Sequence, residues 1–201
     1  MLVLVMMSPH CALGEGGAKR RTGHGPEAKR LLLERMHESL EMAKKSPGAP
    51  DDDDVILMGS ATVRGLFRAP RTHEPAIRMI VADRTLDLET KQLAVRLLQC
   101  LPLPAYVEFL RFVFEEIRRG DCDPSVLRVA IWPGDHWGAV IVERYQDPDV
   151  KKVLLEIKRA GIGDDTFNTV LADTLDGSYA RHVQYLREES PVPFIACEER
   201  R

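Results

Sequence analysis

The chain has 201 residues, of which 44% are hydrophobic and 29% are charged. These are ordinary values for a folded protein, and they exclude a wholly disordered chain. The formal net charge is −3, which has the wrong sign for general attraction to nucleic acid or to an anionic membrane surface. The charge is uneven, since residues 1–50 carry +3 and residues 51–201 carry −6.

Residues 1–25 are predicted to form a flexible arm. The apolar run from Leu2 to Met7 lacks the preceding basic residue and the length of a secretory signal, so export through an atypical signal or a misplaced start is the less favoured alternative. The basic cluster 19–21 could touch phosphate, but a solvated linker is the favoured interpretation. No segment approaches the roughly 20 apolar residues of a membrane span.

The four cysteines, Cys11, Cys100, Cys122 and Cys197, lie far apart in the sequence and form no C-x-x-C pair. Their spacing fits neither a structural zinc site nor a disulfide framework. We therefore predict four reduced thiols in a cytoplasmic protein.

A first helix is predicted from Pro26, with one apolar stripe formed by Leu32, Met36, Leu40 and Ala43, and it ends within the segment 46–50. The four acids 51–54 lack the ligand spacing and glycine of an EF-hand calcium loop, so a charged linker is favoured over a calcium site. Residues 54–68 are predicted as a helix, although their apolar runs also suit strands.

Further helices follow in close succession. Thr72 is predicted to cap one helix and Asp87 the next, and two prolines then introduce a helix over 104–119 with a broad apolar face. Later helices are predicted to start at Asp123, Asp147, Asp164 or Asp165, and Ser178. Short connections make consecutive helices antiparallel neighbours. The sequence thus predicts an all-α protein with a single helical domain over 26–190 and a C-terminal tail over 191–201.

The acidic helix starts at Asp87, Asp123, Asp147 and Asp165 are separated by 36, 24 and 18 residues. With segments such as DPDVKKVLLEIKRA at 147–160 and DLETKQLAVRLLQCL at 87–101, residues 72–190 resemble the HEAT-like helical repeat proteins. The resemblance implies stacked helix pairs with a concave surface that binds other macromolecules. The uneven spacing leaves an irregular helical bundle as the alternative.

One turn between helices concentrates chemistry-bearing side chains, since residues 131–137 hold both tryptophans of the chain. Aromatic walls beside a carboxylate can hold a flat or cationic ligand. The candidate ligand-binding residues are therefore Trp132, Asp135, His136 and Trp137. The favoured interpretation of this turn, however, is that the tryptophans pack a corner and that Asp135 caps a helix containing Val140 and Ile141.

Trp132, Asp135 and Trp137 also resemble the residue types with which the alkylpurine DNA glycosylases, a family with HEAT-like repeats, face a damaged nucleotide. This resemblance implies an enzyme acting on DNA. The acidic body does not favour the phosphate contacts that DNA needs.

Catalytic motifs are otherwise missing from the sequence. His73-Glu74 lacks the second histidine of a zinc protease, His182 is expected to be a packed or rim histidine, and no phosphate loop or G-x-S-x-G occurs. We predict no cofactor or metal, and the sequence leaves any catalytic residue unknown. The favoured function is a non-enzymatic protein-protein interaction module or adaptor with a protein partner. The alternatives are a ligand-binding protein or enzyme at the 132–137 turn, or nucleic-acid binding through the basic arm, which is not expected.

Overall fold

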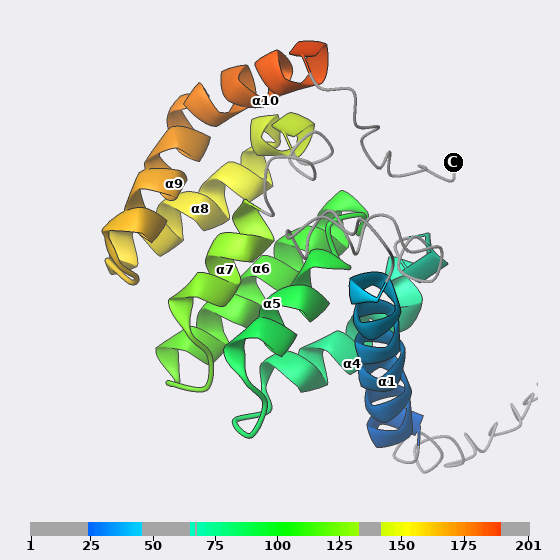
Figure 1. The fold of residues 1–201 in the computed structure, drawn as a ribbon. Coiled ribbons are helices and arrows are strands. Elements are labelled where there is room, and N and C mark those ends of the chain that lie inside the picture. The colour runs from blue at the N-terminus through cyan, green and yellow to red at the C-terminus, as the bar shows by residue number, and fades with distance from the viewer. Residues whose placement is uncertain (1–23, 46–64, 67, 133–141, 190–201) are drawn as a thin grey trace, which may run out of the picture.

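The computed structural model describes residues 24–45, 65–66, 68–132 and 142–189. Within these ranges the chain is helical and contains no strand, so the predicted all-α fold is confirmed (Figure 1). The α-helices are α1 (His24–Lys44), α4 (Pro70–Val81), α5 (Leu88–Arg96), α6 (Leu103–Arg118), α7 (Pro124–Ile131), α8 (Pro148–Ala160), α9 (Asp165–Asp176) and α10 (Ser178–Glu189), with a 3-10 helix, η2 (Val142–Gln146), before α8.

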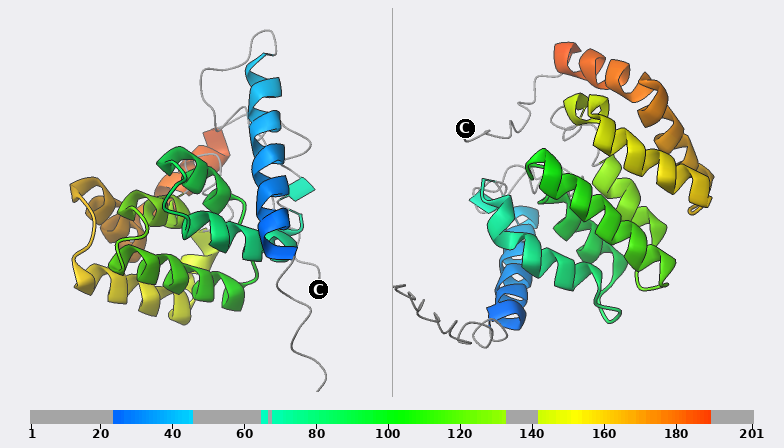
Figure 2. Two further views of the ribbon diagram at one scale, coloured as in Figure 1. Left: turned by 90° about the horizontal axis from the view of Figure 1, so that it is seen from below. Right: turned by 180° about the vertical axis from the view of Figure 1, so that it is seen from behind.

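Three helical hairpins stack in two layers. The hairpins are α4–α5, α6–α7 and α8–α9, and the two helices of each hairpin pack against each other. Helix α6 also contacts α4 and α8, while α7 contacts α5 and α9. One layer is therefore α4–α6–α8, seen from behind in the right view of Figure 2, and the other is α5–α7–α9. Helix α1 packs on α4 at one end of the stack, and α10 packs on α9 and η2 at the other.

Aspartate side chains cap four of these helices, as the sequence predicts. The carboxylate of Asp87 accepts a hydrogen bond from Thr90 N at 2.7 Å, and Asp123 accepts one from Ser125 N at 2.8 Å. Asp147 accepts from two backbone N–H groups of the first turn of α8. Asp164, rather than Asp165, caps α9. Each cap satisfies a backbone donor that the helix itself leaves unpaired and contributes about 1 kcal/mol.

The caps also explain the uneven spacing of the acidic helix starts. Asp87, Asp123 and Asp164 open the three helices of the α5–α7–α9 layer, 36 and 41 residues apart. Asp147 opens α8, which belongs to the other layer. The loops 82–87, 119–123 and 161–164, which join the helices of the three hairpins, lie along one edge of the stack, at the lower left of Figure 1. We call these three loops the loop edge.

A continuous apolar core runs through the stack from Leu32 of α1 to Tyr179 of α10. Helix α6 supplies the broad face predicted for it, with both Phe109 and Leu110 almost fully buried. The guanidinium of Arg78 lies 4.8 Å from the ring centroid of Phe112, on the flank of this core. The helices are thus held by apolar packing, since the described caps and turns satisfy only their ends.

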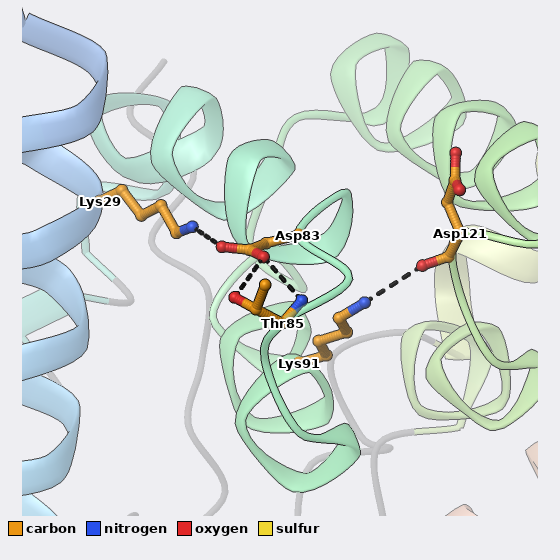
Figure 3. A network of polar contacts seen from close by, with 5 residues as sticks. All are labelled: Lys29, Asp83, Thr85, Lys91 and Asp121. Atoms are coloured by element: carbon orange, nitrogen blue, oxygen red, sulfur yellow. Dashed lines mark hydrogen bonds and ion pairs between the residues drawn. The ribbon is translucent and has the colours of Figure 1, made fainter.

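Polar contacts along the loop edge join α1 to the first hairpin and the first hairpin to the second (Figure 3). Lys29 of α1 forms an ion pair with Asp83, and the hydrogen bond from Lys29 holds the pKa of that carboxyl well below its usual value. The buried Lys91 of α5 donates to the backbone oxygen of Asp121 at 3.2 Å. Arg84 adds an ion pair to the Asp121 carboxylate.

Two predicted helix starts are wrong in detail. Helix α4 begins at Pro70 with Ala69 before it, so Thr72 lies in the first turn and caps nothing. Proline at the first helical position sets the helix start there, because its missing N–H needs no partner. Helix α1 begins at His24, two residues before Pro26.

Several sequence predictions lie outside the described residues. They concern the arm 1–23, the acids 51–54, most of the segment 54–68 and the tail 191–201.

Candidate functional site

The turn singled out in the sequence is described only at its first residue. Trp132 is the C-cap of α7, where its backbone N–H donates to the Arg128 oxygen at 2.6 Å. Its half-buried indole meets the ring of Tyr179 edge-on, with centroids 5.3 Å apart. Asp135, His136 and Trp137 lie outside the described residues, as do Val140 and Ile141. The grouping of these side chains with Trp132 stays a prediction.

Trp132 belongs to an aromatic cluster that joins four elements. Tyr106 of α6, Tyr145 of η2 and Tyr179 of α10 are all buried. The rings of Tyr145 and Tyr179 have centroids 6.1 Å apart, and the Arg144 guanidinium lies 5.2 Å from the ring centroid of Tyr106. The cluster therefore attaches α10 and η2 to the α6–α7 hairpin.

Only some of the polar atoms in this cluster form hydrogen bonds. The Tyr106 hydroxyl donates to the backbone oxygen of Ala130 at 2.9 Å, near the end of α7. The Tyr145 hydroxyl and the Trp132 Nε1 have no hydrogen-bond partner within the described residues; Tyr145 approaches the Tyr106 hydroxyl only outside hydrogen-bond geometry. Burial raises the pKa of both Tyr106 and Tyr145, so both phenols stay protonated. Neither can act as a base, and we read the cluster as packing.

A cavity of about 530 Å³ lies on the loop edge, between the N-terminal ends of α7 and α9. Its α7 side and its α9 side each supply a helix cap and residues of the first turns. The lining residues are Asp123, Pro124, Ser125, Arg128, Gly163, Asp164, Thr166 and Phe167. We call this cavity the α7–α9 pocket.

Arg128 is the charged group of the pocket that has no partner among the described residues. Its side chain is half-buried and makes no hydrogen bond or ion pair to any described residue. The two carboxylates of the pocket, in contrast, are engaged as caps at the positive ends of helix dipoles. The guanidinium thus keeps its donors available to something outside the described chain.

The corresponding place between the first two hairpins is closed by a hydrogen bond. Gln92, five residues after the cap of α5, donates to the hydroxyl of Ser125, two residues after the cap of α7, at 3.1 Å. One hairpin further along, the same positions hold Arg128 and Thr166, and no hydrogen bond joins them. The pocket therefore occupies a position that the preceding hairpin interface fills with a bond.

The face of α7 that carries Arg128 is recessed. Of the eight residues of α7, five are buried and the other three are half-buried. Ser125, Arg128 and Trp132 are spaced by three and four residues, so they share one face of the helix. This face lies between α5 and α9, which both contact α7. Ser125, Arg128 and Trp132 are all half-buried, so this face is partly covered rather than fully exposed.

Other titratable groups in the described chain offer no competing site. His73 is half-buried, and burial together with the nearby positive charge of Arg35 lowers the pKa of its imidazole. His182 is exposed. Within the described ranges no group of three histidine, cysteine or acidic side chains gathers as a metal site would require. No helix among the described residues combines the length and apolar character needed to cross a membrane.

The cysteines depart from the prediction of four reduced thiols. Among the described cysteines, Cys100 is disulfide-bonded and Cys122 is free. Cysteine spacing along the sequence cannot reveal such a pairing. Burial raises the pKa of Cys122 to about 11, which makes it an inert thiol rather than a nucleophile.

The pocket residues were not singled out by sequence reasoning, apart from the two aspartates predicted as caps. The available signal was register: Gln92 and Arg128 each stand five residues after a capping aspartate. These two positions can be recognised as equivalent only when Asp147 is known to start a helix of the other layer.

Comparison of the chain with protein-family models, with curated proteins and with solved structures gives no match. The functional interpretation therefore rests on the geometry of the two-layer stack and of the α7–α9 pocket.

Proposed function

We propose that this protein is a non-enzymatic interaction module that binds a protein partner on the α5–α7–α9 face. The observation that carries the proposal is the recessed face of α7, with the half-buried and unpaired Arg128 beside an open pocket. None of the Arg128 nitrogens is among the described side-chain atoms that are sealed from solvent without a partner, so its donors remain accessible in the pocket while its aliphatic stem is partly covered. A binding partner would replace water at these donors.

The two-layer stack of helical hairpins supports the same proposal. Hairpins whose helices contact the next hairpin in the same layer produce an extended surface, which proteins built in this way use to bind other macromolecules. The cap spacings of 36 and 41 residues within one layer are in keeping with the proposed HEAT-like organisation. The cavity has the size of sites that take part of a ligand or a side chain.

Site-specific photocrosslinking tests the proposal. A photoreactive amino acid is placed at the exposed pocket residue Thr166 of α9 and, as a matched control, at the exposed Lys152 of α8 in the other layer. After irradiation in an extract of the cells that make the protein, we expect a defined protein adduct from position 166 and none from position 152. Mass spectrometry of the adduct identifies the partner.

Two results would contradict the proposal. Equal adducts from both positions would show that crosslinking reports collisions rather than a binding face. No adduct from position 166, together with turnover of a small molecule by the purified protein, would replace it with the enzyme alternative.

A further inference from the structure

We infer that the α7–α9 pocket receives an aspartate or glutamate side chain from a linear segment of the partner, and that Arg128 binds its carboxylate. This inference rests on the proposed function and specifies the chemistry of the partner. It follows from three features of the pocket. The guanidinium of Arg128 has no partner in the described chain, the carboxylates of Asp123 and Asp164 already cap helices, and no hydrogen bond joins the two hairpins here.

The guanidinium of Arg128 is suited to a carboxylate and is placed to receive one. Arginine offers a planar fork of N–H donors that matches a carboxylate with two parallel hydrogen bonds. Because Arg128 is half-buried, such a bond would form with less screening by water than on an open surface. No described residue competes for these donors.

The two aspartates of the pocket do not cancel this preference. Asp123 accepts from both the backbone N–H and the hydroxyl of Ser125, at 2.8 and 2.6 Å. Asp164 accepts from Phe167 N at 2.8 Å. Both carboxylates therefore serve the helix ends, where the dipole of each helix places roughly half a unit of positive charge beside them. The positive charge of Arg128 has no such internal counterpart.

At the interface between the α4–α5 and α6–α7 hairpins, the position that corresponds to the pocket is filled by a hydrogen bond. There the amide of Gln92 already reaches Ser125 and no partner is needed. At the second interface, Arg128 and Thr166 face the cavity without a mutual bond. A carboxylate could accept hydrogen bonds from both, since the Thr166 hydroxyl is exposed and makes no hydrogen bond to another described residue.

Selection from a random peptide library displayed on phage tests the inference with the full chain. We expect wild-type protein to enrich peptides with a fixed aspartate or glutamate. Arg128→Gln should weaken the affinity of a selected peptide at least tenfold, and Arg128→Lys should retain part of it, as expected for loss of a charge-assisted pair. Arg128→Glu should select lysine or arginine at the same peptide position.

The matched control is Arg111→Gln, which removes an exposed arginine of α6 in the other layer and should leave the affinity unchanged. Circular dichroism and melting temperature verify that each variant folds. Peptides without acidic enrichment, an unchanged affinity of Arg128→Gln, or no selected peptide would each overturn the inference. The proposed function is decided separately, by the adduct at position 166.

Discussion

Replacing Gly163 with alanine should lower the free energy of unfolding by about 3 kcal/mol, from left-handed backbone strain and steric overlap together. Gly163 has a φ of 91°, and a Cβ placed on it would lie 2.5 Å from Cδ1 and 2.8 Å from Cγ of Phe167. Phe167 is almost fully buried and cannot move aside without leaving the core. Chemical denaturation followed by circular dichroism measures the loss.

Gly161→Ala is the matched control, because it separates backbone strain from the overlap. Gly161 also has a positive φ, of 62°, but nothing lies within 4 Å of a Cβ placed there. It should cost only about 1 kcal/mol, the penalty of the left-handed conformation alone. Equal losses for the two variants would show that Phe167 does not pack against Gly163, and that this wall of the pocket is placed differently.

Replacing Tyr106 with phenylalanine should cost about 2 kcal/mol, the penalty for an unsatisfied buried polar group. The Tyr106 hydroxyl is the described partner of the Ala130 oxygen, which lies in the last turn of α7 and so lacks an intrahelical donor. Because both groups are buried, water cannot replace the bond without opening the core. Thermal and denaturant unfolding measure the change.

Tyr145→Phe is the companion variant, with an expected effect of less than about 0.5 kcal/mol or a small gain in stability, since it removes a hydroxyl without a proper hydrogen bond. Both variants remove one hydroxyl from a buried tyrosine, but only Tyr106→Phe also removes a hydrogen bond. A loss as large as that of Tyr106→Phe would mean that the Tyr145 hydroxyl is bonded in solution.

The helices could be predicted from sequence because their ends carry local signals. Asp87, Asp123 and Asp147 cap helices as expected, since a carboxylate at that position bonds the first turn wherever the helix packs. The prediction that Thr72 caps a helix was wrong, because Pro70 starts α4 two residues earlier. The layers could not be predicted, since they depend on contacts between hairpins that the sequence does not encode locally.

The candidate site could not be predicted either, because it also depends on contacts between hairpins. The sequence directs attention to Trp132, where rare residue types gather, whereas the described chain places this indole against Tyr179. Arg128 is an ordinary basic residue of a helix until the stack shows it half-buried beside a cavity with no partner in the described chain. The disulfide of Cys100 likewise depends on tertiary proximity.

Hydrogen–deuterium exchange of the protein, free and bound to its crosslinked partner or a selected peptide, tests most directly whether the α5–α7–α9 face is the binding surface. We expect slower exchange over residues 123–132 and 163–170, which contain the floor and the far wall of the pocket. Exchange in α1 and in α8 should stay unchanged. Protection confined to α4, α6 and α8, with none in residues 123–132, would contradict the account.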